Sequence, residues 1–194
     1  MSFLTSTFQS WEKTCYNITP LLKIYNMMYT KIVKKEVFLG GFTSEDIILN
    51  IGCGAAPFTA IHLKNLTGAK IIAIDKDTEA LEKASYVIAN MGLKKDIELV
   101  EADALLHLPT TFTAALTALQ VEPKKEILDK LISNGEKGAR FVFRQPKSLL
   151  KSQYDYLETL HPPVSEVSQS MKTFDKSILY IKDKYSDKYL SHFA

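Results

Sequence analysis

Two closely spaced glycines, and two acids further along the chain, are the residues whose types and order favour ligand binding. The glycines are Gly52 and Gly54 of the segment NIGCGAAP, and the acids are Asp75 and Asp103. Such glycines let a backbone turn sharply and approach a ligand closely, and free amides in the turn would favour an electronegative group. A carboxylate such as Asp75 can accept hydrogen bonds from both hydroxyls of a ribose, and Asp103 could accept one from the amino group of adenine. The set predicts a nucleoside-binding site.

Each acid also has a structural interpretation, which the sequence leaves open. Asp75 could cap the following helix, near Asp77 and Thr78. Asp103 could be a loop residue held by backbone amides.

Two observations narrow the kind of nucleotide. Pro57 stands where a dinucleotide-binding pattern has a glycine for close packing of helix and strand. The Gly-Lys-Ser/Thr ending of a phosphate-binding loop is absent. Both argue against a nicotinamide or flavin cofactor and against a nucleoside triphosphate.

The candidate residues follow short apolar runs, which predict that strands position them. Runs such as 47–51 and 71–74 suit buried parallel strands, and amphipathic helices alternate with them. This alternation predicts an α/β fold with a parallel sheet covered on both faces, where ligands bind beyond the carboxyl ends of the strands. The predicted strands are 47–51, 71–74, 97–100, 114–119, 140–143, 164–170 and 178–182; the predicted helices are two segments within 1–42, then 57–66, 78–91, 123–132 and 147–160.

Length and composition favour one domain with a full-sized core. The chain has 194 residues, 46% of them hydrophobic, which suits a single domain. A net charge of +2 gives no electrostatic case for a nucleic-acid binder, and we expect the lysine pairs 34–35, 94–95 and 124–125 on solvated faces. Cys15 and Cys53 form no metal-ligand or disulfide pattern, so we expect no metal and reduced thiols in a cytoplasmic protein. No segment resembles a secretory signal or a membrane span.

Residues 46–143 resemble the class I S-adenosylmethionine-dependent methyltransferases through three ordered motifs, LNIGCGAAP, IIAIDKD and VEADAL. The resemblance implies a Rossmann-like fold, with a mostly parallel seven-stranded sheet, helices on both faces and a C-terminal antiparallel hairpin. It also implies S-adenosylmethionine as the cofactor, with the glycine loop against its methionine part, Asp75 on its ribose and Asp103 near its adenine. The cofactor contacts implied in this way are Asn50, Ile51, Gly52, Cys53, Gly54, Pro57, Asp75, Lys76, Asp103, Ala104 and Gln120.

The chain departs from that family in its glycine loop. Asn50 stands where the family usually has an acid, so it has no charge to pair with the ammonium group of the cofactor, and Ala56 stands where a third glycine is usual. The form GCGAAPFT resembles the glycine loop of nicotianamine synthases and of staphylopine-type opine metallophore synthases. Those enzymes transfer the aminobutyrate arm of S-adenosylmethionine rather than its methyl group.

Four residues are catalytic candidates on the acceptor side. Gln120 could line the methionine end of the pocket, and Glu122 could act as a base or hold a cationic acceptor. Arg144 could bind a carboxylate or phosphate of the substrate, and Tyr29 could roof the pocket. The structural alternatives are an acid in the first turn of a helix for Glu122 and a surface arginine at a sheet end for Arg144.

Two other residues have weaker functional interpretations. Cys53 is expected to contribute its backbone, although a thiol beside a helix start could be reactive. His62 is expected to be structural.

The expected organisation is one domain over residues 1–194, with a helical cover at 1–45 and an S-adenosylmethionine-binding sheet at 46–194. The leading function is a methyltransferase for a small-molecule acceptor, because a sulfonium is already activated and needs mainly alignment. The alternatives are an aminobutyrate transferase and a non-catalytic cofactor-binding partner subunit. A nucleic-acid acceptor is disfavoured by the near-neutral charge.

Overall fold

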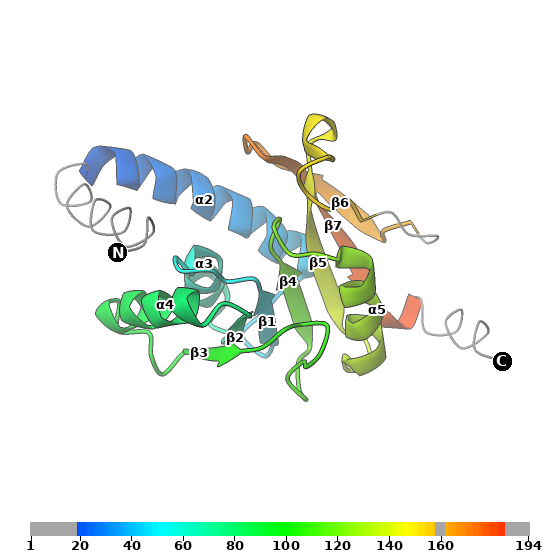
Figure 1. Cartoon of the computed structure of the whole chain (residues 1–194), viewed down its shortest axis with the longest axis horizontal. Helices are drawn as coiled ribbons and strands as arrows, with labels where there is room; N and C mark the ends of the chain where they lie inside the picture. The colour runs from blue at the N-terminus through cyan, green and yellow to red at the C-terminus, as the bar shows by residue number, and fades with distance from the viewer. Residues whose placement is uncertain (1–18, 158–161, 185–194) are drawn as a thin grey trace.

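A single mixed sheet forms the centre of the molecule (Figure 1). The computed structural model describes residues 19–157 and 162–184, and their side chains from residue 29 onward. Within these residues seven strands follow the order β3-β2-β1-β4-β5-β7-β6. The first five are parallel, and β7 is antiparallel to both β5 and β6, as the sequence predicts. The strands are β1 (Ile47–Ile51), β2 (Lys70–Asp75), β3 (Ile97–Glu101), β4 (Ala114–Thr117), β5 (Arg140–Pro146), β6 (Ser165–Ser168) and β7 (Phe174–Ile181).

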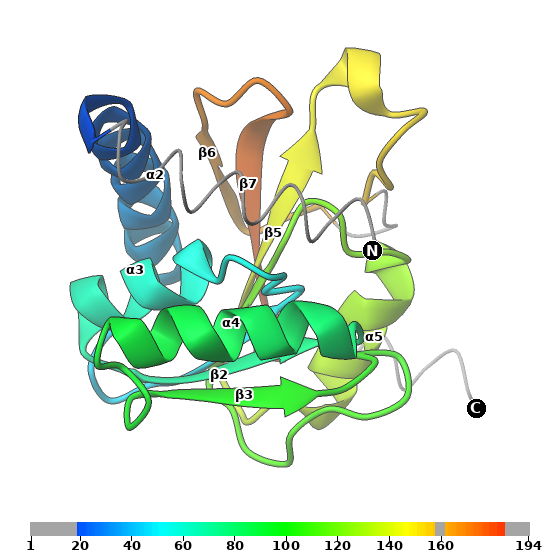
Figure 2. The same ribbon diagram turned by 60° about the vertical axis from the view of Figure 1, so that its left-hand side comes forward.

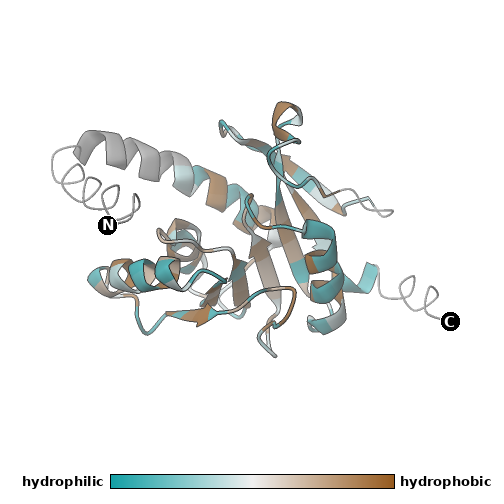
Figure 3. Ribbon diagram, viewed as in Figure 1, coloured by the Kyte–Doolittle hydropathy of each residue, from teal (hydrophilic) through white to brown (hydrophobic). Residues whose placement is uncertain are grey.

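Helices cover both faces of the sheet, as predicted. The α-helices of the described residues are α2 (Thr19–Gly40), α3 (Phe58–Thr67), α4 (Thr78–Asn90) and α5 (Lys124–Asn134). Apolar residues of α5 pack with Leu49 and Phe141 on one face, whereas those of α2, α3 and α4 pack with Ile48 and Leu116 on the other. Figure 2 shows α4 alongside β2 and β3, and Figure 3 shows hydrophobic central strands behind more polar outer helices. Within the described ranges no helix combines the length and apolar character that a membrane span requires.

The segment 147–157 is not the predicted helix. It contains one short 3-10 turn, η1 (Ser148–Leu150). The side chain of Gln145 then donates to the carbonyl of Leu157 and accepts from its amide. This pair of bonds occupies the backbone groups that a helix would use, so the chain runs irregularly here. Residues 158–161, and the predicted helical segment around Phe8–Cys15, lie outside the described residues.

Two strands near the C-terminal end extend beyond their predicted bounds. β5 runs to Pro146 and β7 begins at Phe174. The added residues are partly polar, and the strands continue because Arg144 pairs with Ser177 across the sheet. Arg144 therefore lies inside β5 rather than just after it.

The order of the strands places a crevice beside β1. The chain leaves β1 through α3 to β2 on one side and later returns to β4 on the other side of β1. Diverging connections of this kind leave a gap at the carboxyl ends of the strands, where open α/β sheets bind ligands.

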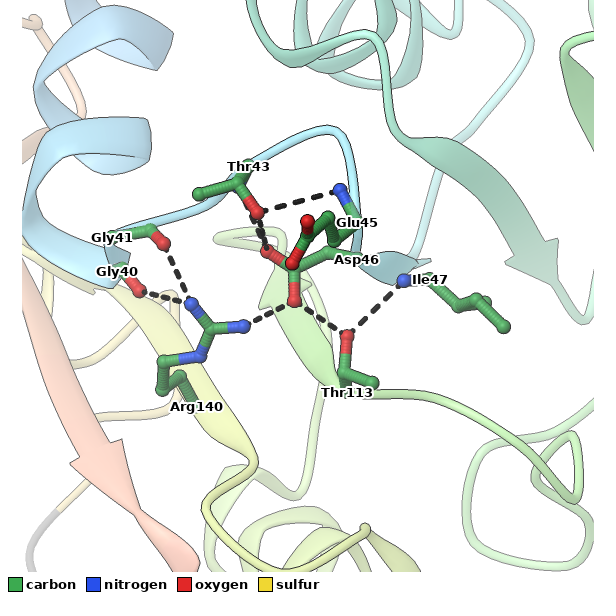
Figure 4. Close-up of polar contacts among 8 residues, drawn as sticks. All are labelled: Gly40, Gly41, Thr43, Glu45, Asp46, Ile47, Thr113 and Arg140. Carbon is green, nitrogen blue, oxygen red and sulfur yellow. Dashed lines mark hydrogen bonds and ion pairs between the residues drawn. The ribbon is translucent and has the colours of Figure 1, made fainter.

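A partly buried ion pair joins the opposite, amino ends of the strands (Figure 4). Asp46, just before β1, accepts from Arg140 at the start of β5 and from Thr113 Oγ1 beside β4. Arg140 also donates to the carbonyls of Gly40 and Gly41 at the end of α2. Burial alone would raise the pKa of Asp46, but hydrogen bonds from Thr113 and Thr43 and the charge of Arg140 lower it below its ordinary 3.8.

The sign of that pKa shift gives a test of the ion pair. Because the pKa of Asp46 is lowered in the folded protein, its carboxylate stabilises the fold fully at pH values above the ordinary pKa of 3.8. This stabilisation is lost as the pH falls through the lower pKa of the folded state. We expect Asp46→Asn to lower the free energy of unfolding at pH 7 by about 1–3 kcal/mol, measured by urea denaturation. The deficit should shrink in acid. The control is Glu98→Gln, which removes an exposed ion pair with Lys70. It should change the free energy of unfolding by no more than about 0.5 kcal/mol. A constant deficit from pH 7 to acid would contradict the role of the Asp46 charge.

Candidate functional site

A cavity of about 930 Å³ lies beyond the carboxyl ends of the parallel strands. Loops that follow β1 to β4 line it, together with residues of α2, α3 and β5. Its size is in the range of small-molecule and cofactor sites. The structure brings most of the predicted site residues to this one cavity: Tyr29, Ile51, Gly52, Cys53, Gly54, Asp75, Lys76, Asp103, Ala104, Gln120, Glu122 and Arg144.

The two glycines of the loop after β1 serve different purposes. Both have positive φ, +76° at Gly52 and +63° at Gly54, which other residues rarely adopt. A Cβ on Gly52 would also lie 2.4 Å from Cγ2 of Val121, so the glycine lets the loop after β4 pack closely. A Cβ on Gly54 would meet nothing within 4 Å. Gly52 thus permits Val121 to pack against the glycine loop, whereas Gly54 borders open space at the cavity.

Three amides of this loop, those of Gly52, Cys53 and Gly54, are not free, which corrects part of the sequence expectation. Gly52 and Cys53 both donate to the carbonyl of Ile74, at 2.9 and 3.1 Å. Gly54 donates to Oδ2 of Asp75 at 2.8 Å. These three donors are therefore satisfied by β2 and are not available to a phosphate.

Asp75 supports the loop and lines the cavity at the same time. Besides Gly54, its carboxylate accepts from the amide of Asp77 at 3.1 Å. It does not cap α4, since Asp77 does so by accepting from the amide of Ala80. An ionised carboxylate has about four lone-pair positions, so Asp75 keeps acceptor capacity for a ligand.

Asp103 makes the contact expected of a loop aspartate and also lies at the cavity. Its Oδ1 accepts from the amide of Leu105 at 2.8 Å, as a loop aspartate does. It also lines the cavity beside the buried Ala104, which leaves Oδ2 for a ligand. Lys76 and Lys83 line the same end, and Lys83 is paired with Glu79.

Asn50 and Pro57 are predicted cofactor contacts that do not line the cavity. Asn50 is fully buried within β1, one residue before the strand ends, and its amide donates to the carbonyl of Leu116 at 3.3 Å. Pro57 is buried directly before α3. Both therefore support the walls of the site rather than form its surface.

The Cys53 thiol is buried, which argues against the reactive alternative raised by its place near a helix start. Burial, with a smaller effect of the Asp75 charge, raises the pKa of the thiol to about 12. The thiolate is the nucleophilic form, so Cys53 serves as a wall of the cavity.

Gln120 and Glu122 lie on the loop after β4, and both are exposed at the cavity. Glu122 precedes α5, which begins at Lys124. It is therefore not the first-turn acid of the structural alternative. The sequence predicts that Lys124 and Lys125 both lie on a solvated face. Lys124 is instead fully buried.

Arg144 is a buried arginine in an ion pair, not a surface residue. Its Nε and Nη2 each donate to a carboxylate oxygen of Glu36 on α2 at 2.8 Å, and Ser177 Oγ also donates to that carboxylate. Its Nη1 donates to the hydroxyl of Tyr29 at 2.8 Å. Burial alone would lower the pKa of Arg144, but Glu36 and Tyr29 raise it, so the guanidinium stays charged.

Tyr29 connects this ion pair to the helix that follows the glycine loop. Its hydroxyl lies 2.7 Å from Oγ1 of Thr59 on α3, and its ring packs near those of Phe58 and His62. His62 is buried, and burial lowers its pKa; this agrees with the structural role expected for it. Tyr29 thus brings part of α2 to the cavity, where a residue that roofs the pocket would have to lie.

Sequence reasoning missed Glu36, Thr59 and Phe58. Glu36 lies on one helical face with Tyr29, Ile32 and Val33. An acid within this otherwise apolar stripe is the sequence feature that could have indicated a buried charge. Phe58 and Thr59 follow the glycine loop directly, where a helix start borders the crevice.

Comparisons with known proteins agree with this geometry. A family model described as a methyltransferase domain matches residues 42–190. L-histidine 2-aminobutanoyltransferase of Yersinia pestis is 25% identical over 126 residues, which are 64% of this chain and 47% of that protein. This chain thus spans about half the length of that curated relative.

Solved structures share the fold. MtNAS, in complex with MTA and tNA, has a TM-score of 0.69 at 22% identity, over 80% of this chain and 60% of that one. An RNA methyltransferase from Salinibacter ruber, in complex with S-adenosyl-L-homocysteine, has a TM-score of 0.65 at 15% identity, over 78% and 90%. The similarity to MtNAS confirms, for the fold, the predicted resemblance to nicotianamine synthases. Since the family model matches most of its length, the chain belongs to the methyltransferase-domain family.

Proposed function

We propose that the chain is an S-adenosylmethionine-dependent transferase that acts on a small molecule, with methyl transfer as the leading reaction. The observation that carries the proposal is the position of Asp75. It is fastened to the glycine loop at Gly54 and lies in one cavity with Asp103. When bound, S-adenosylmethionine would supply a carbon activated by its sulfonium.

The residues of the cavity fit this cofactor at its nucleoside end. Asp75 keeps lone pairs for two ribose hydroxyls, and Asp103 keeps Oδ2 for an adenine amino group. Gly54 lines the same cavity, and a Cβ there would meet nothing within 4 Å.

The loop also fits a cofactor that carries no phosphate. A dinucleotide needs backbone amides for its pyrophosphate, whereas here the amides of Gly52, Cys53 and Gly54 already have acceptors. This supports S-adenosylmethionine over the phosphorylated nucleotides.

Four residues border the proposed acceptor position. Gln120 would line the methionine end, and Glu122 would accept a proton from the acceptor or hold its positive charge. Tyr29 would orient the acceptor through its hydroxyl. Arg144 would act mainly on Tyr29, because Glu36 already occupies the Nε–Nη2 edge of its guanidinium and Nη1 donates to Tyr29.

A small acceptor suits this site better than a nucleic acid. Helix α2 places Tyr29 over the cavity, which narrows the space for an acceptor. The net charge is +2, and burial of Lys124 removes one lysine from the exposed set. Both features weaken phosphate-backbone binding.

A second candidate reaction is transfer of the aminobutyrate arm. It is favoured by the similarity to L-histidine 2-aminobutanoyltransferase and by the loop form GCGAAPFT. The two reactions share the cofactor and differ in the carbon that the acceptor attacks.

Calorimetry with S-adenosylhomocysteine tests the cofactor site. Asp75→Asn should weaken binding roughly 10–100-fold, because hydrogen bonds to a charged acceptor contribute about 1.5–3 kcal/mol. Asp77→Asn is the matched control: this neighbouring acid caps α4 outside the cavity, and its affinity should stay within about twofold of wild type. No detectable binding to the wild-type protein would refute the proposal.

The by-product distinguishes the two reactions. With S-adenosylmethionine and a pool of small amines that includes L-histidine, methyl transfer should accumulate S-adenosylhomocysteine, and aminobutyrate transfer should accumulate 5′-methylthioadenosine. Chromatography of the nucleosides measures both. Cofactor binding without either product would favour the non-catalytic subunit instead.

A further inference from the structure

Lys124 is a buried cation with no part in the site described above. Its side chain is fully buried at the start of α5, where Nζ donates to the carbonyls of Leu119 at 2.9 Å and Asp155 at 2.7 Å. Burial lowers the pKa of this ammonium below its ordinary 10.5, and the charges of Asp155 and Glu122 offset only part of that effect. A buried ammonium is costly unless it is hydrogen-bonded, so these bonds fix both carbonyls relative to it.

One of the two carbonyls belongs to a segment that is itself held in place. Asp155 also accepts the backbone amide of Lys124 through Oδ2 at 2.6 Å, which supplies the cap that Pro123 cannot give to α5. Two residues later, Leu157 is held by the two hydrogen bonds from Gln145 of β5. Asp155 is therefore held between the start of α5 and a segment bonded to β5.

The other carbonyl belongs to the loop that forms the cavity wall. Leu119 directly precedes Gln120, Val121 and Glu122, which all line the cavity. Val121 lies so close to the glycine loop that a Cβ on Gly52 would be 2.4 Å from its Cγ2. The position of the loop after β4 and that of the glycine loop thus depend on each other.

We propose that Lys124 is a positioning residue that holds the loop 118–122 against Gly52 and so shapes the methionine end of the cofactor pocket. Lys124 touches neither cofactor nor acceptor. It acts through the carbonyl of Leu119 and the packing of Val121. The inference rests on the proposed cofactor.

Two nucleoside probes separate this role from a general loss of structure. S-adenosylhomocysteine carries the amino-acid chain that would reach the loop 118–122, and 5′-methylthioadenosine lacks it. In calorimetry we expect Lys124→Met to weaken binding of S-adenosylhomocysteine at least about tenfold. Its affinity for 5′-methylthioadenosine should stay within about twofold of wild type, because Asp75 and Asp103 are unchanged.

Lys125→Met is the matched control. Lys125 is the next residue, is exposed and pairs only along the helix with Asp129, so both affinities should equal those of wild type. Equal losses for both probes in Lys124→Met, or no loss for either, would overturn the positioning role. Failure of the wild-type protein to bind either probe would instead refute the proposed cofactor.

A second variant covers the case in which Lys124→Met does not fold, as judged by its thermal unfolding. Asp155→Asn keeps the main-chain carbonyl that accepts from Nζ but removes the charge that caps α5. It should weaken binding of S-adenosylhomocysteine more than binding of 5′-methylthioadenosine, as in Lys124→Met. The loss of S-adenosylhomocysteine affinity should be smaller than in Lys124→Met. An unchanged ratio of the two affinities in this variant would overturn the proposal.

Discussion

The hydrogen bond from the Gly54 amide to Asp75 joins the carboxyl ends of β1 and β2, two of the strands whose loops form the cavity. Together with the bonds from Gly52 and Cys53 to the carbonyl of Ile74, it folds the loop after β1 back onto β2. That conformation places Gly52 where Val121 can pack against it. The walls contributed by β1, β2 and β4 therefore share one support, and the acid that provides it also faces the ligand space.

β5 joins this support to the rest of the fold at both of its ends. Near its start, Arg140 holds Asp46 and the end of α2. Four residues further on, Arg144 holds Glu36 on the same helix. The helix that roofs the cavity is thus attached by two cations of one strand, the first among the amino ends of the strands and the second at the cavity. One strand therefore carries buried contacts at the amino ends of the sheet and others beside the cavity.

Much of the fold and of the candidate site could be predicted because strand ends carry local signals. The apolar runs before Gly52, Asp75 and Asp103 identify the parallel strands, and parallel strands bring their ends together. Segments governed by distant partners could not be predicted: the chain around Leu157 follows Gln145, and Arg144 is buried because Glu36 meets it from a helix far away in sequence. Likewise, the sequence predicts free amides in the loop after β1. The amides of Gly52, Cys53 and Gly54 are instead bonded to acceptors on β2, which the hydrophobic periodicity does not reveal.

The pairing of Glu36 with Arg144 has a consequence for the order of folding. The two residues are 108 positions apart, and Glu36 is completely buried in the folded chain. Dehydrating a lone carboxylate is costly, so the Glu36 end of α2 becomes favourable to bury only when β5 brings Arg144 to it. The apolar residues of α2 can pack earlier on α3, which is nearer in sequence. We therefore expect the polar end of the contact between α2 and the sheet to form after the apolar one.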